Sequence, residues 1–152
     1  MPTVFECRHF ATLTAGELYA MLVLRSRVFV VEQQCVFLEP DGLDPDAHHL
    51  FGWRDDARLE LVSGVRILAP GVSYDDASIG RVVTAPEHRH GGEGRALMHA
   101  AIRECTRLYP DSAIRIGAQR YLERFYGSLG FTTVSEPYDE DGIEHVTMLR
   151  PR

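Results

Sequence analysis

The chain has 152 residues and 45% hydrophobic content, which suits a single compact domain with its own core. Its formal net charge of −6 argues against nucleic acid as a partner, because nucleic-acid-binding surfaces neutralise phosphates with clustered basic residues. No stretch approaches the roughly eighteen apolar residues of a membrane span, and Met1-Pro2-Thr3 begins no charged leader, so we expect a cytoplasmic address without membrane association.

The first half of the chain predicts one strand, one helix and then three strands. The helix is predicted over Leu13–Val31, because residues of one face recur at steps of three and four after a Thr14 N-cap with Glu17 three residues on. That face consists of Leu18, Met21, Leu22, Arg25 and Phe29. Runs typical of strands occupy Val4–Phe10, His48–Arg54, Arg58–Leu68 and Ser78–Ala85. Proline, glycine and acidic residues predict loops and turns at Cys35–Asp46, Asp55-Asp56 and Pro70–Asp76.

The second half alternates helices with strands. The glycine-rich residues 91–94 open a helix that Pro110 closes, and its apolar face consists of Leu97, Ala100, Ala101, Cys105 and Leu108. A short helix over Arg120–Leu129 ends at Gly130, which suits left-handed geometry. Further strands are predicted at Ala113–Ala118, Phe131–Val134 and Glu144–Leu149, with Asp141-Gly142 as a turn. This order predicts one α/β domain over residues 1–152, with a mixed sheet covered by helices.

A glycine-rich loop, Arg89-His90-Gly91-Gly92-Glu93-Gly94-Arg95, lies between a predicted strand and a predicted helix. Glycines at a helix N-terminus expose backbone N–H groups, and these donors together with the helix dipole favour a phosphate group. Arg89 and Arg95 add positive charge. The spacing matches neither a P-loop nor a G-x-G-x-x-G fingerprint. The glycines alone are equally compatible with a flexible turn that only caps the helix.

Four motifs in this order resemble a known family. Arg89-x-x-Gly92-x-Gly94 is similar to the R/Q-x-x-G-x-G/A signature of the GNAT superfamily of N-acetyltransferases, and Phe125-Tyr126-Gly127-Ser128-Leu129-Gly130-Phe131 resembles its F-Y-x-x-L-G-F signature. A narrower resemblance to the ElaA-like branch is carried by Arg27 to Cys35 with Asp44 and His48, and by Tyr138 to Gly142 with His145 and Met148. The resemblance implies a mixed, mostly antiparallel sheet that is flanked by helices and splayed between its central strands.

The resemblance also implies a binding site for acetyl-CoA as co-substrate. In this family the pantetheine arm pairs with the strand before the loop, and the loop N–H groups hold the diphosphate. The implied cofactor-binding residues are Val82, Val83, Thr84, Arg89, His90, Gly91, Gly92, Glu93, Gly94, Arg95 and Gln119. Gln119 stands where the family often has Asn. Its side-chain amide would contact the cofactor in the same way, from a longer side chain.

The resemblance implies Tyr126 as the general acid that protonates the departing CoA thiolate. Its position in a helical stripe with Leu122, Phe125 and Leu129 by itself favours a core aromatic, and the family resemblance favours the general acid. The general base is open. Glu32, at the end of the first helical region, is the first candidate, and His48, His145 or a water molecule are the others.

No metal is expected. His88-x-His90 with His99 has no fitting carboxylate or thiol, and three widely spaced cysteines make neither a zinc ribbon nor a disulfide framework. The acidic run from Glu136 to Glu144 is typical of a solvated loop, although its place before the last strand would suit an acceptor entrance.

The resulting hypothesis is transfer of an acetyl group to a small-molecule or peptide amine by direct attack in a ternary complex. The alternatives are a CoA-binding or regulatory module without catalysis, and transfer of a longer acyl group. A homodimer is left open.

Overall fold

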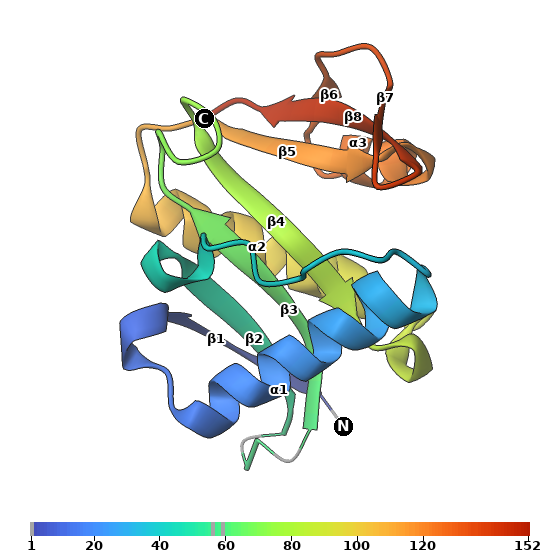
Figure 1. Ribbon diagram of the computed structural model, residues 1–152. Coiled ribbons are helices and arrows are strands. Elements are labelled where there is room, and N and C mark those ends of the chain that lie inside the picture. Colours follow the sequence, from blue (N-terminus) through green and yellow to red (C-terminus); the bar gives the residue numbers. More distant parts are fainter. Residues whose placement is uncertain (1, 56, 59) are drawn as a thin grey trace.

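The computed structural model describes residues 2–55, 57–58 and 60–152 (Figure 1). Three predictions extend onto the remaining residues: Met1 of the segment expected not to be a leader, Asp56 of the predicted turn and Leu59 of the predicted third strand lie outside the described residues. Within the described residues, no helix combines the length and the apolar character that crossing a membrane requires.

Eight strands form one sheet, and helices cover it (Figure 1). The strands are β1 (Thr3–His9), β2 (His48–Arg54), β3 (Glu60–Leu68), β4 (Ala77–Thr84), β5 (Ile114–Gln119), β6 (Thr132–Thr133), β7 (Tyr138–Glu140) and β8 (Ile143–Arg150). The α-helices are α1 (Ala15–Arg25), α2 (Glu93–Leu108) and α3 (Glu123–Gly127). Helix α1 continues into a π-helical turn, η2 (Ser26–Glu32), and short 3-10 turns precede β2, α2 and α3.

The strand order is β1-β2-β3-β4-β5-β8-β6, with β7 pairing β8. All pairs are antiparallel except β4 with β5, so the predicted mixed, mostly antiparallel sheet is confirmed. Strands β4 and β5 pair only at Ala77↔Ile114 and Ser78↔Arg115. Beyond those positions they diverge, which is the splay that the family resemblance implies (Figure 1).

The predicted loop over the acidic run from Glu136 to Glu144 is wrong. Tyr138–Glu140 forms β7, which pairs with β8 from Tyr138↔His145 to Glu140↔Ile143. Asp141 and Gly142 have φ values of 54° and 80°, and positive φ at both central residues is the geometry of a tight two-residue hairpin turn. The turn and the edge of β8 override the low strand propensity of the acidic residues.

Several element boundaries differ from the prediction. The helix predicted over Leu13–Val31 is α-helical only to Arg25, and the one predicted over Arg120–Leu129 is α-helical only over Glu123–Gly127. Arg58, the predicted start of the third strand, lies in the preceding turn with φ 54°, and β3 begins at Glu60. The first helix begins after the Thr14 cap, whose side chain accepts a hydrogen bond from Glu17 N while Glu17 bonds back to Thr14 N. The predicted capping box is therefore present.

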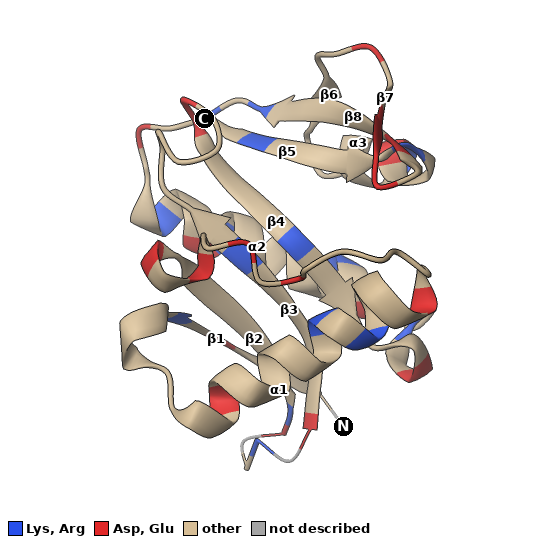
Figure 2. Ribbon diagram, in the orientation of Figure 1, with Lys and Arg blue, Asp and Glu red and all other residues tan. Residues whose placement is uncertain are grey.

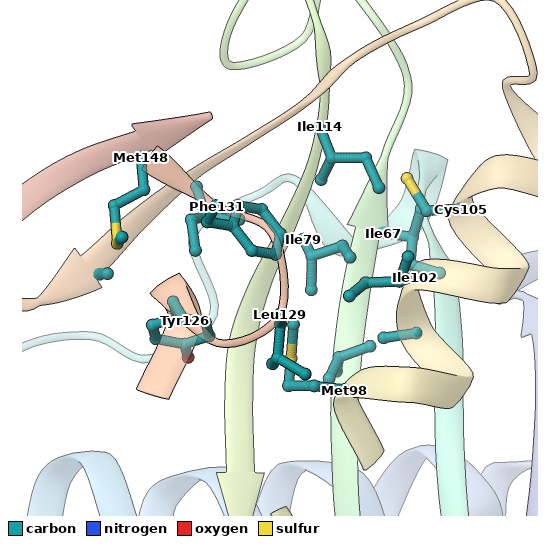
Figure 3. Packing of buried hydrophobic residues seen from close by; sticks show 14 of the residues in the cluster. Ile67, Ile79, Met98, Ile102, Cys105, Ile114, Tyr126, Leu129, Phe131 and Met148 are labelled. Atoms are coloured by element: carbon teal, nitrogen blue, oxygen red, sulfur yellow. The ribbon is translucent and has the colours of Figure 1, made fainter. Parts of the chain in front are cut away.

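The main core packs α2 against the sheet (Figure 3). The predicted apolar face of α2 faces inward, with Leu97, Ala100, Ala101 and Cys105 buried and Leu108 partly buried. Helix α1 covers the opposite face, where Met21 packs with the stacked rings of Phe51 and Trp53. The sheet is therefore held between α1 and α2, and its splayed half extends beyond both (Figure 1).

Candidate active site

A cavity of about 910 Å³ lies where β4 and β5 diverge. Twelve of the predicted site residues line it: Glu32, Val82, Val83, Thr84, Arg89, His90, Gly92, Gly94, Arg95, Gln119, Tyr126 and His145. Gly91 and Glu93 of the predicted loop are not among the lining residues. His48 is not brought to the cavity either; its ring packs edge-on against that of His9, at the paired ends of β1 and β2.

One wall of the cavity is the edge of β4 that faces β5. Strand β4 stays paired with β3 as far as Ser63↔Thr84, but its pairing with β5 stops at Ser78. Arg81 has φ 49° and lies at a bulge in the β3–β4 ladder, which bends β4 away from β5. The edge from residue 79 to residue 84 therefore has peptide groups that no strand satisfies, and an extended chain with amides of its own would complement it.

The N-terminus of α2 presents a second set of free donors. The first backbone hydrogen bond within the helix runs from Ala96 N to Gly92 O, and Gly92 makes no side-chain cap. The N–H groups of residues 92–95 precede this bond, so the helix does not satisfy them. His90 and Gly92 have φ values of 70° and 84°, which is typical of compact turns that form anion-binding concavities. Helix α1, in contrast, is capped by Thr14.

The motif arginine is paired with the first base candidate. Arg89 Nη1 and Nη2 donate to the two carboxylate oxygens of Glu32 at 2.8 and 2.7 Å, and Arg89 Nε donates to Thr84 O at 3.1 Å. A hydrogen bond from Arg89 lowers the pKa of Glu32. The pairing joins the end of η2 to the loop before α2, and it makes Glu32 a weaker proton acceptor than a free carboxylate.

Tyr126 lies on α3 at the border between the core and the cavity (Figure 3). Its ring packs edge-on against Phe125 and Phe131, at centroid distances of 5.2 and 6.0 Å. Burial raises the pKa of Tyr126 to about 12. Its hydroxyl is therefore protonated at neutral pH, which is the state that a proton donor requires. The ring belongs to the core, as the helical stripe predicts, and the residue also lines the cavity; its role as general acid stays a prediction.

His145 lines the cavity from β8. Its Nδ1 lies 2.7 Å from Ile143 O, and a carbonyl only accepts, so Nδ1 carries the proton in the neutral ring. Nε2 is then the basic nitrogen, and it lies 3.3 Å from a carboxylate oxygen of Glu140. Tyr138 stacks on the imidazole at 6.0 Å. The ring is held in one orientation, with a carboxylate beside the nitrogen that can take up a proton.

A strap formed by residues 33–46 crosses the splayed region and borders the cavity with Cys35 and Phe37 (Figure 1). A largely buried ion-pair network attaches the strap to α1 and β3. Arg25 Nη1 donates to Asp44 at 2.8 Å, and Arg66 donates to Asp44 at 3.3 Å and to Asp41 at 2.8 Å. Cys35 Sγ donates to Asp141 O at 3.4 Å, which joins the strap to the β7–β8 turn. We did not predict this network, although the sequence holds its signal, a charged Arg25 within an otherwise apolar helical face.

His49 belongs to the same network and predicts a pH-dependent stability. Burial lowers the pKa of His49 to about 4, and its Nε2 donates to Asp44 O while Arg25 Nη2 donates to its Nδ1. The unfolded chain has the ordinary pKa of about 6.5 and binds more protons between these values, so stability falls as pH falls from 6.5 to 4. We expect the loss to reach about 3 kcal/mol.

Urea unfolding of the wild type and of His49→Gln across this range measures the effect. The variant should lack most of the slope between pH 6.5 and 4, since glutamine does not titrate. Equal slopes in the two proteins would contradict the assignment to His49.

Among the described residues, His88, His90 and His99 do not form a group of metal ligands. Instead Glu60, Glu87 and His88 offer ligand atoms within 4.8 Å of one another, at the surface and outside the cavity lining. Two of these groups are in contact with each other, with His88 Nε2 2.7 Å from Glu60 Oε1, and Arg27 donates to Glu87. We assign no metal function to them.

Comparison with known proteins agrees with this geometry. The family model of the acetyltransferase (GNAT) domain matches residues 48–150. The chain therefore belongs to the GNAT acetyltransferase family. It is 42% identical to protein ElaA of Escherichia coli over 144 residues, which are 93% of this chain and 92% of ElaA. The resemblance to the ElaA-like branch is thereby confirmed.

Solved structures show the same fold over almost the whole chain. A crystal structure of an acyl-CoA N-acyltransferase from Pseudomonas aeruginosa matches with a TM-score of 0.91 and 43% identity, covering 97% of this chain and 99% of that one. The crystal structure of Escherichia coli ElaA matches with a TM-score of 0.89 and 39% identity, again covering 97% and 99% of the two chains.

Proposed function

We propose that this protein is an N-acetyltransferase that moves the acetyl group of acetyl-CoA to an amine by direct attack within a ternary complex. One observation carries the proposal: a single cavity joins the free donors at the α2 N-terminus, the open β4 edge, Tyr126 and His145. A phosphate-binding end and a proton-transfer end in one cavity are what a CoA-dependent transfer to an amine needs.

The cofactor would lie along elements that the fold leaves unsatisfied. The diphosphate would accept hydrogen bonds from the N–H groups of residues 92–95, close to the charges of Arg89 and Arg95, which both line the cavity. The pantetheine amides would pair with the open β4 edge at Val82–Thr84, and N–H groups near Val83 would polarise the thioester carbonyl. Acetyl-CoA supplies the activated acetyl group; the fold supplies the strand edge and the helix end.

We infer that His145, rather than Glu32, is the general base. The carboxylate of Glu32 is bonded at both oxygens to Arg89, whereas His145 has its basic nitrogen beside only the Glu140 carboxylate. His145 Nε2 would accept the amine proton as the C–N bond forms. Tyr126 would then donate its proton to the sulfur as the C–S bond breaks, so that protons and electron pairs balance.

Separate variants distinguish the two base candidates. We expect His145→Gln to lower kcat about 10²-fold or more with KM for acetyl-CoA little changed, because a general base contributes to the chemical step. We expect Glu32→Gln to raise KM for acetyl-CoA several-fold with kcat nearly kept, because it removes the partner that positions Arg89. Steady-state kinetics of free-thiol release measures both. The reverse pattern would restore Glu32 as the base.

The proposed reaction itself is tested by free-thiol release from acetyl-CoA with a panel of amines. Release that depends on both the amine and Tyr126 supports the transferase. CoA binding without turnover on any amine would contradict it and would favour a CoA-binding module. Competition between short acyl-CoA donors tests the preference for acetyl over longer chains.

A further inference from the structure

The charges that line the cavity are separated along its length. The end at the α2 N-terminus carries Arg95, His90 and the Arg89–Glu32 ion pair. The other end is bordered by the β7–β8 hairpin, which contributes Glu140 and Asp141 to the lining (Figure 2). The basic end suits the diphosphate, so the acidic end is left for the second substrate.

One basic residue does line the cavity near the strap, but its charge is already satisfied. Arg81 Nε donates to Glu39 Oε1 at 2.7 Å, and Arg81 Nη2 donates to Glu39 O at 3.3 Å and to Asp41 Oδ2 at 3.4 Å. The Glu39 side chain is only 2% exposed, so this pair is fixed in the protein rather than open to exchange with solvent. A substrate carboxylate would have to compete with Glu39 and Asp41 for the Arg81 guanidinium.

Two neutral hydroxyl groups lie close to one wall residue at this end. Gly117 of β5 lines the cavity, and a Cβ on it would lie 3.1 Å from the Tyr138 hydroxyl and 3.6 Å from that of Tyr74. The missing side chain lets both hydroxyl oxygens approach this wall. Neither tyrosine lines the cavity, and neither adds a positive charge for a carboxylate.

Resting on the function proposed above, we propose that the acceptor is a cationic amine without a carboxylate near its amino group, such as a diamine, rather than a free amino acid. Glu140 and Asp141 attract the ammonium group to the acidic end, next to His145, which takes the proton. A carboxylate beside the reacting amine would meet those acids with no free arginine in the described cavity lining near them to balance it.

Isothermal calorimetry on the full chain saturated with CoA tests this class without requiring turnover. The probes are 1,4-diaminobutane and 4-aminobutanoate, which share a chain length and one amino group but differ in the charge at the other end. At low salt, we expect 1,4-diaminobutane to bind at least tenfold more tightly. Equal or tighter binding of 4-aminobutanoate, or no binding of either probe, would overturn the proposal.

Charge-neutral variants locate the effect. Glu140→Gln should weaken 1,4-diaminobutane binding about tenfold and shrink the preference over 4-aminobutanoate. Glu136→Gln is the matched control, since Glu136 is an exposed acid before the same hairpin that does not line the cavity, and both affinities should stay unchanged. An unchanged preference in Glu140→Gln would also overturn the proposal.

The two proposals fail in distinguishable ways. Diamine binding without thiol release from acetyl-CoA would contradict the transferase and leave the charge preference standing. Faster turnover of 4-aminobutanoate than of 1,4-diaminobutane would contradict the charge preference and leave the transferase standing.

Discussion

Replacing Tyr126 by phenylalanine should lower kcat for acetyl transfer by about 10²- to 10⁴-fold, the usual contribution of a general acid. The variant keeps the ring that packs against Phe125 and Phe131, so the core should stay intact. Only the hydroxyl is lost, whose raised pKa keeps it protonated in the working range. Free-thiol release at saturating acetyl-CoA measures the effect, and calorimetry should show unchanged CoA affinity.

Tyr121→Phe is the matched control for this variant. Tyr121 lines the same cavity and is 76% exposed, and it has no proposed part in proton transfer. Its kcat should stay within about twofold of the wild type. A Tyr126→Phe enzyme that also keeps its kcat would show that the residue serves only the core, and the leaving thiolate would then need another proton source.

Replacing Gly94 by glutamate should weaken CoA binding without lowering the stability of the fold. Gly94 lies in the first turn of α2, where an acidic side chain stabilises a helix by about 0.3–1 kcal/mol. A Cβ there would meet only Thr84 Oγ1, at 3.9 Å, so the fold tolerates the side chain. The new carboxylate would repel the diphosphate, and we expect the Kd of CoA to rise at least about tenfold while Tm is unchanged or higher.

Gly94→Gln separates charge from bulk in this experiment. Glutamine has nearly the size of glutamate without its charge, so CoA affinity should fall much less. Calorimetric Kd values at low and high salt complete the test, because the repulsion in Gly94→Glu should weaken as salt screens it. Wild-type affinity in Gly94→Glu would remove the diphosphate from the α2 N-terminus.

Two ion pairs connect the glycine-rich loop region to η2. Arg89 with Glu32 and Arg27 with Glu87 both join η2 to the segment before α2. The same η2 contributes Val28 and Phe29 to the cavity wall. A substitution at Glu32 can therefore also shift the η2 residues of the cavity wall. The KM values for acetyl-CoA and for the amine should be measured separately in Glu32 variants.

Local sequence was sufficient wherever one segment carries its own signal. The capping box at Thr14, the glycine-rich start of α2 and the Asp141-Gly142 turn all occur as predicted, because each depends on residues a few positions apart. The periodic apolar face of α2 likewise predicted which side is buried. Strand β7 was missed, because its acidic residues have low strand propensity and the pairing comes from β8.

In the candidate site, too, the sequence predicted some features and the structure was needed for others. The residues of the loop, Tyr126 and His145 were identified from motifs, and the structure places all three groups around one cavity. The ranking of the bases could not come from the sequence. Glu32 and Arg89 are 57 residues apart in the chain, and only the packing of η2 against the loop shows that the carboxylate is already paired.

By itself, the sequence determined the family, the order of elements and the helix start that we assign to the diphosphate, since these follow from short-range patterns and motif spacing. The tertiary structure decided how far β4 and β5 separate, which carboxylates are already neutralised by arginines, and which charges face the cavity. Those properties depend on side chains that meet across long stretches of chain, such as Arg81 with Glu39 or Arg89 with Glu32. Electrostatic pairing of that kind depends on distance in space, and the chain acquires those distances only by folding.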